Sequence, residues 1–249
     1  MGQVAYRSAT GVHPYHARLD LLQGVSGLLL VMFMWMHMFM VSSILLGKDA
    51  MFTVTRFFEG EFFFGRPYPL LVSMVASAIL LIFLLHALVA MWKLPGSYRE
   101  YRVFWQHSRN FRHADTSAWL VQVVSGLVLM FLASIHLYEM IMHPGNIGPY
   151  ASADRIVTDG MWLLDLLLIF AVEVHSGVGL YRLFMKWDLW GSTRSASRRL
   201  WTRRVITGIV VFYLALGLLT FAAYVKIGVE HRSSAGERYL PNGYRTRVN

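Results

Sequence analysis

The chain has 249 residues, of which 56% are hydrophobic and 15% charged, and its 23 basic against 14 acidic residues give a formal net charge of +9. This composition is typical of a membrane protein rather than a soluble one. The sequence has no cysteine, which excludes disulfides, iron–sulfur ligation and covalent attachment of a c-type haem. Its first twenty residues lack the pattern of a secretory signal peptide.

Five apolar stretches are each long enough, at about 20 residues, to cross roughly 30 Å of hydrocarbon. They cover residues 21–47, 67–92, 116–141, 160–185 and 205–225. The fourth is the least pure because it contains Asp165, Glu173 and His175. We therefore expect an all-α fold, in which residues 1–249 form one integral membrane domain with a bundle of five transmembrane helices. Buried helices of a soluble protein are the alternative.

The lysines and arginines of the loops indicate the orientation of these spans, because basic loops are retained in the cytoplasm. The loops after the second and fourth spans are rich in them, whereas those after the first and third carry few. We therefore expect a multi-pass protein of the cell inner (cytoplasmic) membrane with a cytoplasmic N-terminus. The C-terminal tail, residues 226–249, is expected to be loosely ordered on the outer side, although its five basic residues run against the rule.

Four histidines lie inside apolar spans, one in each of the first four: His37, His86, His136 and His175. An ionisable group at membrane depth is costly enough to be interpreted as functional. A rise of about 1.5 Å per residue places His37 and His136 together on the outer side of the midplane. The same reckoning places His86 and His175 on the inner side, with the two pairs about 13 Å apart.

Two histidines from two helices at a common depth can supply both axial ligands of a haem iron. The sequence therefore predicts two stacked b-type haems enclosed by the bundle, and electron transfer rather than oxygen binding, because neither iron would have an open site. A packing or proton-relay role is the alternative for any single histidine. The other histidines fall in loops or tails and are interpreted as solvated: His13, His16, His107, His113, His143 and His231.

The first and third spans share a short sequence repeat. Residues 25–28 and 124–127 both read Val-Ser-Gly-Leu, and a histidine follows ten residues after each glycine. Ten helical residues place Gly27 and Gly126 about 15 Å from that histidine, at the level of the inner pair and on broadly the same side. We expect these glycines to make room for the edge of the inner haem, with ordinary small-residue helix contacts as the alternative.

Five stretches carry a resemblance: HMFMVSSILLG from His37, RHADTSAW from Arg112, IHLY from Ile135, FAVEVHSGVGLYRL from Phe170 and GLLTFAAYVKIG from Gly217. In this order they resemble the five-helix, di-haem cytochrome b subunit of menaquinone-linked fumarate reductases and succinate dehydrogenases. The resemblance runs from about residue 20 to residue 230, and all four span histidines have counterparts in it. Both termini lie outside it.

The resemblance implies a membrane anchor for two cytoplasmic partners, an iron–sulfur subunit and an FAD-containing catalytic subunit, and it is compatible with a dimer of heterotrimers. Menaquinol would be oxidised near the outer face, and electrons would pass through the two bis-histidine haems to the iron–sulfur subunit. The chain would thus be the quinone-reactive subunit of an enzyme whose fumarate or succinate site lies on a partner. We expect the chain to contact membrane lipid and not to bind nucleic acid.

Two other functions remain open. One is the cytochrome b anchor of a hydrogenase or formate dehydrogenase. The other, from a different class, is a haem-free proton-coupled transporter that uses histidine and glutamate as relay groups.

Two acids are candidates for proton chemistry. Glu59 lies in an aromatic run, residues 57–64, where low polarity raises a carboxyl pKa toward the range useful for accepting a proton. The resemblance implies that Glu59 accepts a proton from menaquinol, and an ordinary interfacial acid is the alternative. Glu173 lies about 160° around the fourth helix from His175, so it is not expected to be a partner of that histidine. We interpret it as a proton-transfer group, with a partner of a neighbouring polar side chain as the alternative.

Three residues near the inner boundary complete the candidate site. Gln23, Trp119 and Lys186 resemble family residues that hydrogen-bond the propionates of the inner haem. Each would otherwise be an anchor at the membrane interface.

Overall fold

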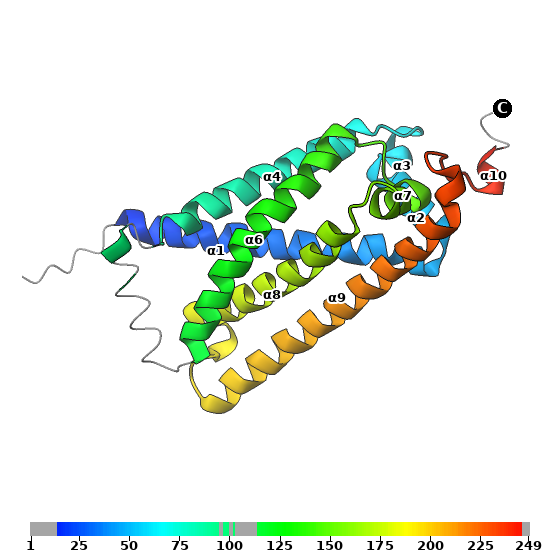
Figure 1. The fold of residues 1–249 in the computed structure, drawn as a ribbon. Coiled ribbons are helices and arrows are strands. Elements are labelled where there is room, and N and C mark those ends of the chain that lie inside the picture. Colours follow the sequence, from blue (N-terminus) through cyan, green and yellow to red (C-terminus); the bar gives the residue numbers. More distant parts are fainter. Residues whose placement is uncertain (1–13, 95–96, 100–101, 103–113, 246–249) are drawn as a thin grey trace, which may run out of the picture.

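The structure is a computed structural model that describes residues 14–94, 97–99, 102 and 114–245, and its regular elements within these ranges are all helices. Five long helices run between the two ends of the molecule (Figure 1): α1 (Pro14–Val41), α4 (Leu70–Met91), α6 (Ala114–Met142), α8 (Trp162–Lys186) and α9 (Ala196–His231). Shorter helices connect them: η1 (Ser42–Leu46), α2 (Lys48–Phe58), α3 (Glu61–Phe64), α7 (Pro149–Val157), η2 (Leu189–Gly191), η3 (Arg232–Ser234) and α10 (Asn242–Arg245). The predicted all-α five-helix bundle is confirmed.

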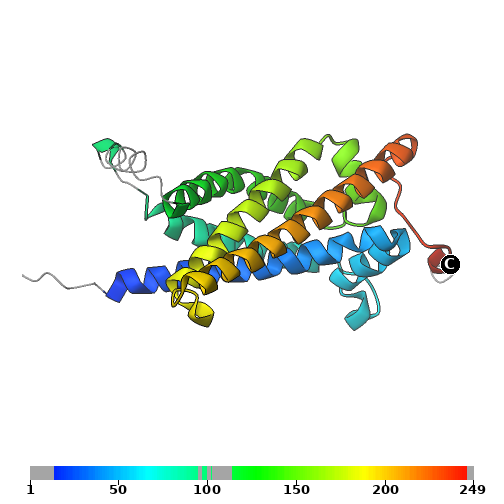
Figure 2. The ribbon, with the colours of Figure 1, turned by 90° about the horizontal axis from the view of Figure 1, so that it is seen from below.

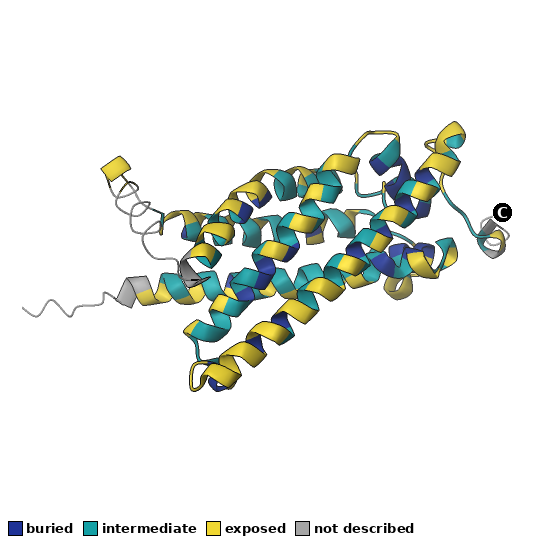
Figure 3. Cartoon of the chain, turned by 60° about the horizontal axis from the view of Figure 1, so that its bottom comes forward, coloured by how far each residue is buried: buried dark blue, intermediate teal, exposed yellow. Residues whose placement is uncertain are grey.

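All five long helices are long and apolar enough to cross a membrane, with mean hydropathies from 1.8 to 2.6 over their most apolar windows. Helices suit this environment because each backbone N–H and C=O is satisfied within the segment, where no water is available. Figure 3 shows exposed residues along all of these helices. Large apolar residues are among them, for example Leu81, Phe131 and Phe212. These side chains meet lipid in a bilayer, so the chain is a multi-pass membrane protein.

The fifth long helix is longer than the apolar run from which it was predicted. That run covers residues 205–225, whereas α9 extends from Ala196 to His231. Its start is capped by Ser195, whose hydroxyl accepts a hydrogen bond from the Arg198 backbone N–H at 3.2 Å. Hydrophobicity predicts only the part of a helix that lies in hydrocarbon. Polar turns extend α9 beyond that part at both ends.

Four of the long helices, α1, α4, α6 and α8, pack in a closed ring, and α9 packs against α1 and α8. Around the ring, α1 packs on α4, α4 on α6, α6 on α8, and α8 again on α1. Among the described residues, α1 packs little against α6, and α4 packs little against α8. Residues that meet from α1 and α6, or from α4 and α8, therefore meet across the interior of the ring.

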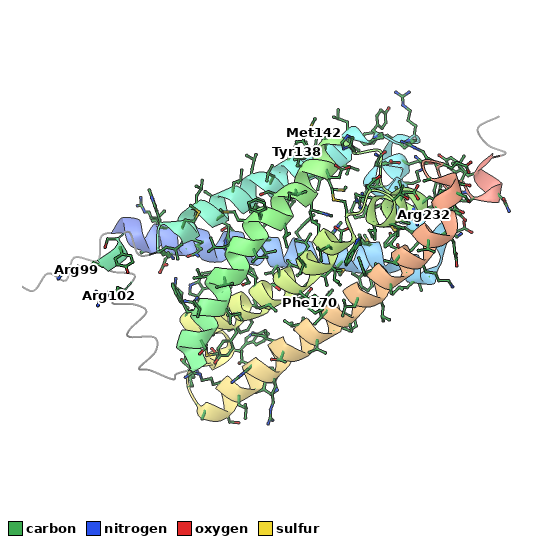
Figure 4. All side chains as sticks on the ribbon, viewed as in Figure 1. Arg99, Arg102, Tyr138, Met142, Phe170 and Arg232 are labelled. Carbon is green, nitrogen blue, oxygen red and sulfur yellow. The ribbon has the colours of Figure 1, made fainter. Side chains whose placement is uncertain are left out.

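The two ends of the bundle differ in construction. Helices α2, α3 and α7 gather at one end with residues 232–245, and we call this the tail end (Figures 1 and 2). The opposite end, called the basic end, carries Lys93, Lys186 and the start of α9. Arg99 and Arg102 also lie there, at the far end of the molecule from Arg232 (Figure 4).

The most deeply buried apolar cluster lies at the tail end, where η1, α2, α7 and α9 meet. Its members are Ile44, Met51, Ala153, Ile156 and Tyr224. A Cβ added to Gly228 of α9 would lie 2.7 Å from the Ala153 carbonyl oxygen, so α7 lies directly on the α9 backbone. The tail end is thus a packed cap.

The expectation of a loosely ordered tail with a solvated His231 is wrong for the described residues. The His231 side chain is only 9% exposed, and its Nδ1 lies 3.1 Å from Asp154 Oδ1. Its ring stacks on Tyr150 at a centroid distance of 3.8 Å. The Gly236 backbone N–H donates to the other Asp154 oxygen at 2.9 Å. The buried carboxylate of Asp154 requires such partners, which explains why the start of the tail docks onto α7.

Of the remaining histidines that were expected in loops, only His143 has a described side chain. The His143 side chain is 52% exposed and lies 3.1 Å from Glu139, one helical turn earlier. His13, His107, His113 and the side chain of His16 lie outside the described residues.

Candidate functional site

The four span histidines meet in the two pairs that their depths indicate. The ring centroids of His37 and His136 are 6.5 Å apart, and those of His86 and His175 are 6.4 Å apart. Two imidazoles that bind one metal ion from opposite sides, each at about 2 Å, place their centroids about 6 Å apart. Both pairs therefore have the separation that a shared metal ion requires, and haem ligation stays a prediction.

Each histidine pair spans the interior of the helix ring. His37 on α1 meets His136 on α6, toward the tail end, and His86 on α4 meets His175 on α8, toward the basic end. Because α1 and α6, like α4 and α8, face each other across the ring rather than packing together, the rings meet inside the bundle.

His86 is held by a turn of α1. Its Nδ1 lies 3.1 Å from the Ser26 hydroxyl and also bonds the backbone carbonyl of Gln23. A Cβ on Gly27 would lie 2.9 Å from the His86 ring, so the missing side chain admits the imidazole. Holding Nδ1 in this way orients the ring and leaves Nε2 to bind a metal.

His175 is held in a similar way by a turn of α6, with the difference that the side-chain amide of Gln122 lies 3.4 Å from its Nε2. Its Nδ1 lies 3.2 Å from the Ser125 hydroxyl and 3.1 Å from the Gln122 backbone carbonyl. A Cβ on Gly126 would lie 3.0 Å from the His175 ring. The two glycines thus lie at the level expected for them, and in the structure they contact the histidine rings.

The repeated sequence that contacts these two histidines is longer than the four residues Val-Ser-Gly-Leu. It runs from Gln23 to Leu28 and from Gln122 to Leu127, and each copy contributes a glutamine carbonyl, a serine hydroxyl and a glycine. Sequence reasoning missed Ser26, Ser125 and Gln122 as contacts of histidine. The signal was present, because the serine stands beside the glycine in both copies.

The His37–His136 pair has different surroundings. Phe33 stacks on the His37 ring at 5.7 Å, and Asp165 Oδ1 lies 3.8 Å from His136 Nδ1. A small cavity beside this pair is lined by His136, Asp165 and Arg155 of α7, among others. Arg155 places a cation next to the pair, and the sequence showed it only as a lone basic residue in an outer loop.

Two of the three predicted inner-boundary residues share a charged cluster at the basic end. Asp20 lies 2.6 Å from Lys186 Nζ and also pairs with Lys93. Lys93 in turn donates to the side-chain oxygen of Gln23. Trp119 lies at the same end of the bundle, near the start of α6. Lys93 and Asp20, which connect Gln23 to Lys186, were not predicted as members of the site.

Glu173 is fully buried in α8, at 0% exposure. Neither of its carboxyl oxygens has a hydrogen-bond partner among the described residues, and the same holds for the indole N–H of Trp35, which faces it from α1. The Trp35 ring stacks on Tyr213 of α9 at 5.2 Å. A buried acid without partners is costly, and such a group is typical of a proton-handling site in a membrane protein.

Glu59 lies at the end of α2 in the tail end and is only 2% exposed. Its Oε2 is 2.7 Å from Arg56 Nη1, and the same guanidinium lies 3.6 Å from Glu61. Burial raises the pKa of the Glu59 carboxyl, while the charge and hydrogen bond of Arg56 act in the opposite direction. Glu59 is thus a carboxyl that can take up a proton above the usual pH range of an acid.

A shallow cavity adjoins Glu59. It is lined by α2, by the loop around Gly148 and by two residues of the C-terminal tail, Arg238 and Tyr239. Next to it, α3 exposes Phe62, Phe63 and Phe64. A polar recess beside exposed aromatic rings at the end of a membrane bundle suits a ligand that has an apolar body and a polar head.

Comparison with known proteins gives consistent matches. Residues 98–216 match the model of the succinate dehydrogenase/fumarate reductase transmembrane subunit family. The fumarate reductase cytochrome b subunit of Helicobacter pylori is 45% identical over 219 residues, covering 88% of this chain and 84% of that protein. The subunit of the same name from Wolinella succinogenes is 44% identical over 214 residues, covering 86% of this chain and 84% of its own length. The chain therefore belongs to the family of cytochrome b transmembrane subunits of fumarate reductases and succinate dehydrogenases.

Proposed function

We propose that this chain is the membrane anchor of a quinol:fumarate oxidoreductase, in which it holds two b-type haems and oxidises menaquinol at the tail end. The observation that carries the proposal is the pair of matched histidine contacts, each with the separation of two imidazoles on one metal ion. The similarity to fumarate reductase subunits favours this function over a hydrogenase or formate dehydrogenase anchor.

The residues around the histidines fit a haem in each pair. Bound haems supply one-electron transfer between the two ends of the bundle. The two copies of the repeat orient the rings of His86 and His175, because a backbone carbonyl and a serine hydroxyl contact each ring. At the basic end Gln23 and Lys186 would hold the propionates of the inner haem, and Trp119 joins them as predicted.

Arg155 would hold the propionates of the haem in the His37–His136 pair, because it supplies the cation beside His136. The tail end is the outer side in this proposal, and the basic end faces the cytoplasm in accord with its positive charge. An iron–sulfur subunit and an FAD-containing catalytic subunit would dock on the basic end, with fumarate or succinate bound by the latter.

Glu59 is the proposed proton acceptor for menaquinol. Its carboxylate can accept the hydrogen bond of a quinol hydroxyl and then the proton, since burial raises the pKa of this group. The cavity beside it and the exposed phenylalanines of α3 would admit the naphthoquinol head from the membrane. Glu173, farther along the bundle, is proposed as a group that carries protons through the interior.

Replacing one histidine of a pair tests the haem assignment. In His175→Ala and in His136→Ala we expect one haem to be lost per chain while the other pair keeps its own, as measured by a reduced-minus-oxidised spectrum with a haem count on the purified complex. His143→Ala, a solvated histidine just beyond α6, is the matched control and should keep two haems. Retention of both haems in the two pair variants would refute the ligand assignment.

Glu59→Gln should abolish quinol chemistry without disturbing the rest of the complex. Turnover of fumarate with a naphthoquinol should fall by roughly 10²- to 10⁴-fold, the usual contribution of a general base. Turnover with a viologen dye that reduces the partner subunits directly should be kept. Since the carboxylate is the active form, the unmodified rate should rise with pH around a midpoint above 4.5, the ordinary value for glutamate. An equal quinol rate in Glu59→Gln, or a matching loss in the exposed control Glu237→Gln, would contradict this role.

Glu173→Gln probes the interior proton route. We expect it to slow quinol-linked turnover roughly 10²-fold or more, as loss of a proton-transfer group does, while both haems remain bound and viologen-linked turnover is kept. Glu230→Gln, an exposed acid on α9, serves as the charge control. If quinol-linked turnover in Glu173→Gln equals that of the unmodified complex, Glu173 carries no essential proton.

A further inference from the structure

The described part of the C-terminal tail, residues 232–245, crosses the tail end over α2 and α3, and we call it the strap (Figures 1 and 2). At its start, the Gly236 N–H bonds Asp154 of α7. Farther along, the Tyr239 hydroxyl donates to Asp49 of α2 at 2.5 Å. Near its end, the Tyr244 hydroxyl donates to Glu61 of α3 at 3.2 Å. The strap is thus fastened to three separate helices of the cap.

Aromatic packing reinforces these fastenings. The Phe52 ring of α2 lies edge-on to both Tyr239 and Tyr244, at centroid distances of 6.2 and 5.1 Å. The Arg56 guanidinium lies against both rings, 4.8 Å from the Phe52 centroid and 5.3 Å from the Tyr244 centroid. The strap therefore packs on the same arginine that holds Glu59.

Arg238 lies between the fastened points and lines the same cavity as Glu59. One of its guanidinium nitrogens is only 3.1 Å from where a Cβ on Gly145 would stand, so the glycine leaves room for this side chain. Among the described residues Arg238 forms no hydrogen bond or ion pair. Arg56, by contrast, is engaged with Glu59, Glu61 and two aromatic rings.

A quinol carries two oxygens at opposite ends of its ring system. Oxidation removes a proton from each hydroxyl and two electrons from the ring. Glu59 would take one proton, the second would leave to solvent through the shallow cavity, and the electrons would pass one at a time to the haems. The quinone product then presents two carbonyl oxygens that accept hydrogen bonds. Glu59 can serve one oxygen as an acceptor, but a donor is needed to hold the other. A guanidinium supplies such a donor and favours the oxygen as negative charge develops on it.

We propose that Arg238 binds the quinol oxygen remote from Glu59, and that the strap holds it in place, so that the C-terminal segment completes the quinol site. This inference rests on the proposed role of Glu59.

Arg238 also acts on Glu59 through its charge. The charged groups that face Glu59 are Arg56 of α2, Glu61 of α3 and Arg238 of the strap, and the phenol of Tyr244 lies among them. The positive charge of Arg238 lowers the pKa of Glu59, against the larger effect of burial. Removing that charge should raise the pKa of Glu59 and move the acid limb of the pH profile to higher pH.

Arg238→Gln in the purified complex, assayed with dimethylnaphthoquinol as donor and fumarate as acceptor, tests the inference. We expect KM for the naphthoquinol to rise roughly tenfold or more, as loss of a charged hydrogen bond implies, with a smaller change in kcat and an acid limb displaced upward. Arg238→Lys keeps the charge and should restore the pH profile while recovering KM in part, because an ammonium lacks the guanidinium fork. Arg232→Gln, an exposed arginine on the same strap, is the matched control and should leave KM unchanged.

The outcomes separate this inference from the function beneath it. If Glu59→Gln abolishes quinol turnover and Arg238→Gln leaves both KM and the pH profile unchanged, the inference is overturned and the function stands. If Arg238→Gln lowers haem content or viologen-linked turnover along with quinol turnover, its role is structural and the inference is again overturned. If Glu59→Gln itself keeps full quinol turnover, the proposed function fails at this site.

Discussion

The arrangement of the whole bundle depends on placing imidazole rings opposite one another, edge-on, across an apolar interior. Four polar rings inside a membrane are costly unless each has a partner. The structure meets this requirement by setting His37 toward His136 and His86 toward His175 across the helix ring. Two glycine-containing turns then orient the second pair, because only a residue without a side chain lets each ring approach the opposite backbone.

The elements that sequence predicts well are those with a periodic or positional signal. Five apolar runs marked five long helices, and depth along those helices sorted the four histidines into the pairs that meet. The glycines were found in the same way, from a spacing of ten residues that recurs in two helices. In each case the information is local to one helix, or follows from the antiparallel arrangement of neighbouring spans.

What the sequence could not predict are contacts between residues far apart in the chain. Asp154 and His231 are separated by 77 positions and neither lies in a recognisable motif, so nothing indicated that the tail docks onto α7. The Asp20 cluster joins α1 to residues at the ends of α4 and α8 for the same reason. Ser26 and Ser125 are an instructive middle case, because the repeat displayed them but their direction toward histidine requires the neighbouring helix.

We propose that each of the two histidine pairs holds one haem iron by two imidazoles. Electron paramagnetic resonance of the oxidised, unmodified complex at low temperature tests it most directly, because the signal reports the axial ligands of ferric haem. Ligation of both irons by two histidines predicts two low-spin signals of bis-imidazole type, equal in amount to each other and to the chain. A high-spin signal from a haem with an open position, or only one haem per chain, would contradict it.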